Sequence, residues 1–213
     1  DVYKRQEEER KEFAMVTTGG DESLIDLTED RFYAGMGTAL GKDSYFLYGG
    51  NGEVYSVFEV DGGMKLLREI QLDFVSGGEK EFEYIAQLMA DTAGRLHAII
   101  EKAKWSDEGW YVTEEKYRYC VISAEGELLA EYVTADTGAE LVPLYDGRVA
   151  LATEQVNQGR LLLQCMDVGA NRLTTVLDCE KELAKFNYYY TLTDESTLVY
   201  ANAMGIYRRS LSG

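Results

Sequence analysis

Proline, histidine and cysteine are scarce in this sequence, and each shortage excludes a class of protein. The 213 residues contain 1 Pro, 1 His and 3 Cys. A proline-rich linker, a zinc site and a disulfide scaffold therefore lack the residues that they need. His97 has no recognisable nucleophile motif beside it, which predicts a structural or surface role. Cys120 and Cys165 are expected to be small buried residues within strands.

Positive charge is also in short supply. The chain has 38 Asp and Glu against 21 Lys and Arg, a net charge of −17 that repels nucleic-acid phosphates and anionic membrane surfaces. No apolar run approaches the roughly 20 residues that span a bilayer. We therefore expect no nucleic-acid partner, no transmembrane segment, no metal site and no cofactor.

Short apolar runs that end at glycine turns are abundant. Runs rich in Tyr, Val and Leu alternate with these turns, a pattern typical of antiparallel strands joined in hairpins. The predicted second strands of successive repeats begin near Tyr45, Leu96, Val149 and Leu198, roughly 50 residues apart. One small sheet cannot cover both of its faces, so repeats of this length stack around an axis as β-propeller blades. The sequence predicts an all-β fold, a partial β-propeller of about four blades of antiparallel four-stranded sheets.

Other interpretations stay open, both globally and locally. A β-sandwich or an open barrel would also show many short strands. Glu83–Asp91 has helical apolar spacing, but a glycine turn and a β-run follow it, so we expect a strand. Cys179–Lys185 contains good helix formers and is expected to be a single helical turn. Gly35–Gly41 is similar to a nucleotide-binding glycine loop, but a strand follows it, which favours a turn at the entrance of a blade.

The candidate ligand-binding residues are Trp105, Trp110 and Tyr111. They lie within Lys102–Glu115, which we expect to form a long exposed hairpin loop. Aromatic rings on such a loop can stack on sugars or peptides. Trp105–Trp110 is also similar to the aspartate box of sialidase-type propellers, but its spacing is too short and no paired carboxylates accompany it. No catalytic residue is predicted.

The repeated strand-turn blocks resemble those of bacterial β-propellers. They are Asp43–Tyr48, Gly94–Ile100 and Asp146–Leu151, with the hairpin Tyr119–Leu128 between them. Their order is similar to the propeller region of extracellular solute-binding lipoproteins of gut clostridia. That resemblance implies a non-catalytic recognition or scaffold module of a secreted or surface-anchored protein. It also implies an extracellular or cell-surface location and the capture of a solute, a sugar or a peptide, for an ABC importer. A protein is the alternative partner.

The N-terminal end is set apart from the repeats. Asp1–Gln6 look like a translated sequencing adapter, which predicts a metagenomic fragment, and an acidic run follows them. We therefore interpret residues 1–12 as a scar and charged tether, and residues 13–213 as one propeller domain. Two alternative functions stay open: a fragment of a glycosidase- or lyase-type propeller enzyme with its catalytic residues elsewhere, and a protein–protein scaffold.

Overall fold

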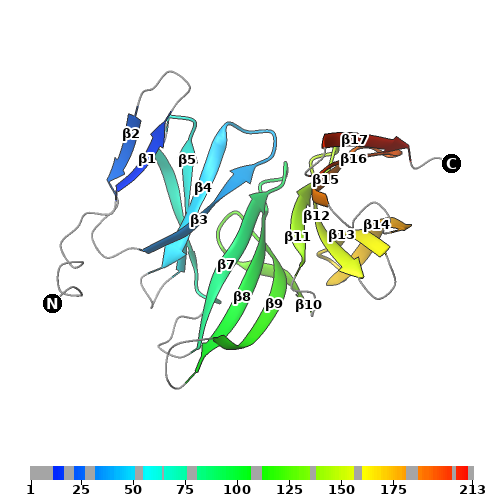
Figure 1. Cartoon of the computed structure of the whole chain (residues 1–213). Helices are drawn as coiled ribbons and strands as arrows, with labels where there is room; N and C mark the ends of the chain where they lie inside the picture. Colours follow the sequence, from blue (N-terminus) through cyan, green and yellow to red (C-terminus); the bar gives the residue numbers. More distant parts are fainter. Residues whose placement is uncertain are drawn as a thin grey trace.

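Every regular element in the described part of the chain is a β-strand (Figure 1). The computed structural model describes residues 12–16, 22–26, 32–50, 55–63, 65–75, 81–106, 112–134, 138–155, 160–180, 187–202 and 205–210. Hairpins join consecutive strands into small antiparallel sheets, as the alternation of apolar runs and turns predicts.

The strands form four successive units, which we call blades 1 to 4. Blade 1 is β3 (Phe32–Ala39), β4 (Ser44–Gly50), β5 (Tyr55–Asp61) and β6 (Leu66–Leu72); blade 2 is β7 (Glu81–Ala90), β8 (Leu96–Trp105), β9 (Val112–Ile122) and β10 (Leu128–Thr134); blade 3 is β11 (Glu140–Pro143), β12 (Val149–Gln155), β13 (Arg160–Asp167) and β14 (Arg172–Glu180); blade 4 is β15 (Asn187–Asp194), β16 (Thr197–Asn202) and β17 (Gly205–Ser210). A separate hairpin pairs β1 (Glu12–Val16) with β2 (Glu22–Asp26). The four residues that set the predicted repeat lie in the second strand of their blades, which confirms the period.

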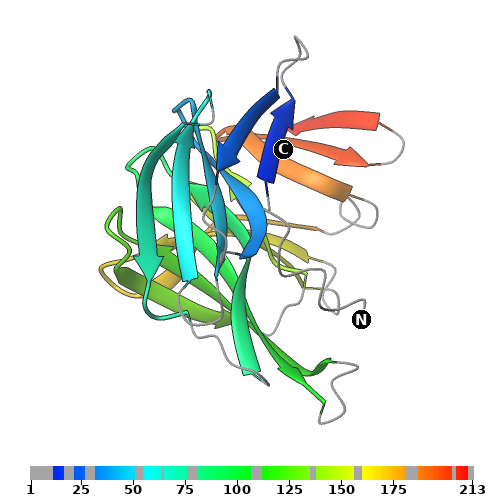
Figure 2. The same ribbon diagram turned by 90° about the vertical axis from the view of Figure 1, so that its left-hand side faces the viewer.

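The first strands of the blades lie next to one another. β3 and β7 run parallel and pair at Thr38 with Met89 and at Ala39 with Ala90, which joins blades 1 and 2 into one eight-stranded sheet. β7 in turn contacts β11, and β11 contacts β15. The blades therefore follow one another around a common centre, as two perpendicular views show (Figures 1 and 2). This arrangement confirms the predicted β-propeller over a β-sandwich or an open barrel.

Apolar side chains fill the spaces between successive blades. One cluster lies between blades 1 and 2 and includes Phe46 and Leu96. A second lies between blades 2 and 3 and includes Tyr119 and Leu151, and a third lies between blades 3 and 4 and includes Leu163. Each blade thus covers a face of its neighbour, which is the physical reason that the repeats stack.

The turn between the first and second strands has the same hydrogen bonds in blades 2 and 3. In blade 2, Gly94 N–H donates to Asp91 O at 3.0 Å, and Asp91 N–H donates to Arg95 O at 2.9 Å. Leu144 to Arg148 of blade 3 repeat this pattern. Gly94 and Gly147 have φ of +83° and +81°, a left-handed conformation that favours glycine. We call these connections the inner turns.

Two local expectations were wrong because strands were read as connections. Residues 35–39 belong to β3 rather than to a turn, and only Leu40 and Gly41 turn. A Cβ at Gly37 would lie under 3.0 Å from the Leu88 carbonyl, so the absence of a side chain at Gly37 allows β3 and β7 to pack this closely. The expected loop Lys102–Glu115 is mostly a hairpin, in which Lys102 pairs with Lys116 and Ala103 with Glu115.

The remaining local expectations had mixed outcomes. Cys179 lies in β14 opposite Leu161 rather than in a helical turn, and residues 181–186 lie outside the described part of the chain. Glu83 to Ala90 form a strand, as expected. Cys120 and Cys165 are buried in strands, which confirms that prediction.

Candidate functional site

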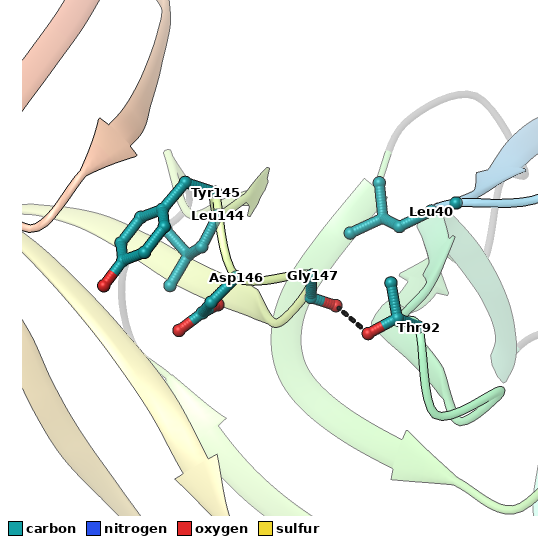
Figure 3. Close-up of a pocket in the computed structure, with 7 residues that line it drawn as sticks. Leu40, Thr92, Leu144, Tyr145, Asp146 and Gly147 are labelled. Atoms are coloured by element: carbon teal, nitrogen blue, oxygen red, sulfur yellow. Dashed lines mark hydrogen bonds between the residues drawn. The ribbon is translucent and has the colours of Figure 1, made fainter.

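The inner turns of blades 1, 2 and 3 surround an open depression of about 430 Å³ near the centre of the blades (Figure 3). We call it the axial mouth. Its lining residues come from three turns that are far apart in sequence: Leu40, Gly41, Thr92, Leu144, Tyr145, Asp146 and Gly147. Apolar, aromatic, hydroxyl and carboxylate groups therefore meet in one place.

Thr92 and Gly147 fix the spacing between blades 2 and 3 at the mouth. Thr92 donates to Gly147 O twice, from its backbone N–H at 3.0 Å and from Oγ1 at 3.3 Å (Figure 3). A Cβ at Gly147 would lie less than 3.0 Å from the methyl and hydroxyl of Thr92. The turns can therefore meet this closely because residue 147 is a glycine.

Tyr145 is held by its backbone and leaves its ring accessible. Its N–H donates to Leu192 O of blade 4 at 3.1 Å. The Thr191 hydroxyl donates to Pro143 O, which adds a second link between blades 3 and 4. The Tyr145 side chain is 45% exposed, whereas Leu144 beside it is buried. The result is an aromatic surface on a firmly placed turn.

Asp146 is the carboxylate of the mouth, and Arg148 already engages it. Arg148 Nε and Nη2 each lie 2.7 Å from Asp146 Oδ2, and the Arg148 backbone N–H donates to Oδ1 at 3.1 Å. These bonds orient the Asp146 side chain, and its carboxylate oxygens can also accept a hydrogen bond from a ligand.

A buried polar network lies behind the inner turn of blade 2. His97 Nδ1 lies 2.6 Å from the Tyr119 hydroxyl, and His97 Nε2 lies 3.2 Å from Asp91 Oδ2. Arg95 completes the network, with Nε and Nη2 at 2.8 and 2.7 Å from the same Asp91 oxygen. A neutral imidazole satisfies this geometry: Nε2–H donates to Asp91, and Nδ1 accepts from Tyr119.

The pKa shifts of this network agree with a neutral His97. Burial lowers the pKa of His97 even though the Asp91 carboxylate opposes the shift. Burial alone would raise the pKa of Asp91, but hydrogen bonds from His97 and Arg95 outweigh it and lower that pKa to about 2. Tyr119 is 0% exposed and His97 only 4%, so no substrate can reach this triad-like arrangement. The network holds the turn that carries Thr92, and the prediction of a structural His97 is confirmed.

Trp105, the one predicted aromatic residue that the structure describes, does not lie at the axial mouth. Trp105 is the last residue of β8, whose other end, Leu96, adjoins the inner turn of blade 2. A ten-residue strand is about 30 Å long, so Trp105 lies at the opposite end of the blade. Trp110 and Tyr111 lie outside the described residues. Sequence reasoning therefore missed the mouth, whose one signal was the recurrence of glycine turns in phase with the repeat.

Within the residues that the structure describes, no group of three or more His, Cys, Asp or Glu side chains is placed to hold a metal ion. Over the same residues, no helix has the length and apolar character that crossing a membrane requires.

Comparison with known proteins gives information on the fold. The sequence matches no protein-family profile and no curated protein. Among solved structures, a luciferin-regenerating enzyme superposes with a TM-score of 0.53 at 12% identity, over 95% of this chain and 66% of its own. A protein from Lactobacillus plantarum has a TM-score of 0.38 at 13% identity, over 92% of this chain and 76% of its own. Hydrazine synthase of Kuenenia stuttgartiensis has a TM-score of 0.40 at 10% identity, over 94% and 70%.

The first of these structures supports the architecture already described. This chain spans just under two thirds of the length of the luciferin-regenerating enzyme, and at 12% identity the likeness extends to the fold alone. The chain is therefore an all-β protein with a β-propeller fold, whose described residues form three four-stranded blades, one blade of three strands and a separate two-stranded hairpin.

Proposed function

We propose that this chain is a non-catalytic recognition module, and that its axial mouth binds a small solute, such as a sugar or a peptide. The observation that carries the proposal is the mouth itself, where three inner turns place an exposed aromatic ring beside a carboxylate in an open depression of about 430 Å³. Pockets for small ligands are commonly about 300–1,000 Å³ and combine apolar walls with a few polar groups.

The lining suits recognition because it is rigid. Thr92 and Gly147 tie the turns of blades 2 and 3 together, and Tyr145 is tied to blade 4. A ligand would therefore meet a preformed surface, which limits the entropy lost on binding. The Tyr145 ring could stack on the apolar face of a sugar or on a peptide side chain, while Asp146 fixes the orientation through a hydrogen bond.

Binding fits the chemistry of the mouth better than catalysis does. General acid–base chemistry needs a group that can gain or lose a proton beside the substrate. The Asp146 carboxylate is already engaged by Arg148, and the neutral imidazole of His97 is buried in the Asp91 network. The described lining offers no pair of groups poised for proton transfer.

The biological setting is also part of the proposal. The resemblance to propeller regions of clostridial solute-binding lipoproteins supports a secreted or surface-anchored protein that captures a solute for an ABC importer. A net charge of −17 agrees with a partner that carries no dense negative charge. A small solute is favoured over a protein partner because the feature described is a depression that fits a small ligand.

Nuclear magnetic resonance titration tests the proposal. The probes are glucose, maltose, N-acetylglucosamine and blocked tripeptides, and the reporters are the backbone amides of Thr92 and Gly147. We expect at least one probe to shift both amides, and Tyr145→Ala to weaken that binding about tenfold because the ring is lost.

Tyr132→Ala is the matched control for this experiment. Tyr132 lies on β10 and is 43% exposed, close to the 45% of Tyr145, but it is not part of the mouth. Binding should be unchanged in that variant. Failure of every probe to shift the reporter amides, or equal losses in the two variants, would overturn the proposal.

A further inference from the structure

We infer that the axial mouth selects a cationic ligand: an ammonium or guanidinium group on a small solute, such as a lysine- or arginine-containing peptide. The inference rests on the proposed function and names the ligand class of the same site. It is carried by the accessible Tyr145 ring in the depression and by the charges that the fold places around that ring.

Blade 4 brings additional negative charge to Tyr145. The hydrogen bond from Tyr145 N–H to Leu192 O places the inner turn of blade 4 beside the ring. That turn carries Asp194 and Glu195, and both act electrostatically on the Tyr145 hydroxyl together with Asp146. Burial and these three carboxylates raise the pKa of Tyr145, so the ring stays neutral at physiological pH.

The Asp194 carboxylate keeps its charge. Asp194 Oδ1 accepts from Ser196 N–H at 2.8 Å and from Ser196 Oγ at 3.0 Å, and the backbone bond is the main reason that the pKa of Asp194 is lowered. Glu195, the next residue, is exposed. Arg148 is the cation that acts on Tyr145, and it is occupied by Asp146. Arg208 acts on Asp194, so three carboxylates are set against two guanidinium groups, which still leaves an excess of negative charge around the ring.

An aromatic face and an excess of carboxylates favour the same ligand. A cation placed over an aromatic ring at an exposed site gains about 0.5–1 kcal/mol, and nearby carboxylates add to this attraction. A phosphate or an acidic sugar would be repelled by the same groups. Lys42 lies on the opposite side of the mouth, where its Nζ would be 3.9 Å from a Cβ at Gly94. The cationic end of a ligand is therefore expected on the side of blades 3 and 4.

Three blocked tripeptides and one sugar test this inference on the 213-residue chain. They are acetyl-Gly-Lys-Gly-amide, its norleucine and glutamate counterparts, and maltose, titrated at low salt with the Thr92 and Gly147 amides as reporters. We expect the lysine peptide to bind at least about fivefold more tightly than the norleucine peptide. Added salt should reduce that ratio, because screening weakens exposed charge interactions.

A pair of charge-removing variants separates local from overall charge. Glu195→Gln should weaken lysine-peptide binding about twofold to threefold and leave the norleucine peptide unaffected. Glu127→Gln removes the same charge from an exposed position on the turn between β9 and β10 and should have little effect. Equal effects of the two variants would mean that net charge alone attracts the peptide, and would overturn the inference.

The outcomes also separate the two proposals. If maltose, norleucine or glutamate peptides shift the reporter amides at least as strongly as the lysine peptide, selection for a cation is overturned and solute binding at the mouth stands. If no probe shifts these amides, both proposals fail.

Discussion

Replacing Gly147 by alanine should destabilise the fold more than the same change at Gly94. Both glycines occupy the same position of an inner turn, with φ of +81° and +83°. Their surroundings differ: a Cβ at Gly147 would collide with Thr92, whereas a Cβ at Gly94 would have Lys42 Nζ at 3.9 Å as its nearest neighbour. The pair therefore separates backbone strain from contact between blades.

The expected magnitudes follow from this difference. A non-glycine residue in the left-handed region costs about 1–2 kcal/mol, and alanine recovers about 0.4–1 kcal/mol by restricting the unfolded chain. Gly94→Ala should therefore cost about 1 kcal/mol. Overpacking adds about 1–3 kcal/mol, so Gly147→Ala should cost about 3 kcal/mol. Removing the Thr92 methyl and hydroxyl in Thr92→Ala should recover part of that extra cost.

Urea unfolding monitored by far-ultraviolet circular dichroism measures these costs. The free energy of unfolding is compared among the wild-type chain, Gly94→Ala, Gly147→Ala, Thr92→Ala and the Gly147→Ala/Thr92→Ala double variant, provided that the slopes agree. Equal destabilisation by the two glycine substitutions would refute the claim that the Thr92–Gly147 contact fixes the spacing of blades 2 and 3. Strict additivity in the double variant would refute it as well.

Two further predictions concern the interior. The free energy of unfolding should fall as the pH is lowered below 6.5, because His97 takes up a proton in the unfolded chain, whereas its lowered pKa in the folded chain opposes protonation. In urea unfolding measured at a series of pH values, His97→Gln should remove this pH-dependent loss. Asp91 contributes about 2 kcal/mol to the free energy of unfolding, because its charged form is favoured in the fold. That contribution should be lost as the pH falls from 3.8, the ordinary pKa of Asp91, to its folded pKa of about 2. Gly37→Ala should cost about 2 kcal/mol because its Cβ would press on the Leu88 carbonyl between β3 and β7, and calorimetry showing an unchanged melting temperature would contradict this.

The repeat was predictable because burial imposes a period on the sequence. In every repeat, the apolar side chains of the strands must face the neighbouring blades. Arg160–Asp167 is one such run, and it has the same bounds as a strand in the structure. β3 was not predictable, because Gly37 permits close packing against β7, a contact between segments about 50 residues apart, and Gly35 makes room for the Tyr48 side chain of β4. The hairpin at Lys102 was hidden by charged side chains on its exposed face, where Lys102 and Lys104 alternate with the buried Ala103.

The axial mouth was beyond sequence reasoning for a different reason. Leu40, Thr92 and Tyr145 are each an ordinary turn or strand-end residue when read alone. They become neighbours only when three blades are arranged around a centre, and their distances depend on the contact between Thr92 and Gly147. Trp105 was predicted to bind a ligand because aromatic residues on long loops often do, but β8 places it at the far end of its blade.

The short parallel pairing of β3 with β7 bears on how such a chain could evolve. Within a blade, long ladders of backbone hydrogen bonds join the strands, whereas this junction has two paired positions and otherwise depends on side-chain packing. Duplication or deletion of one whole repeat would break few backbone hydrogen bonds and would bring similar packing surfaces together again. The number of repeats should therefore be able to differ among proteins that descend from a common ancestor, while the geometry of each junction between blades is retained.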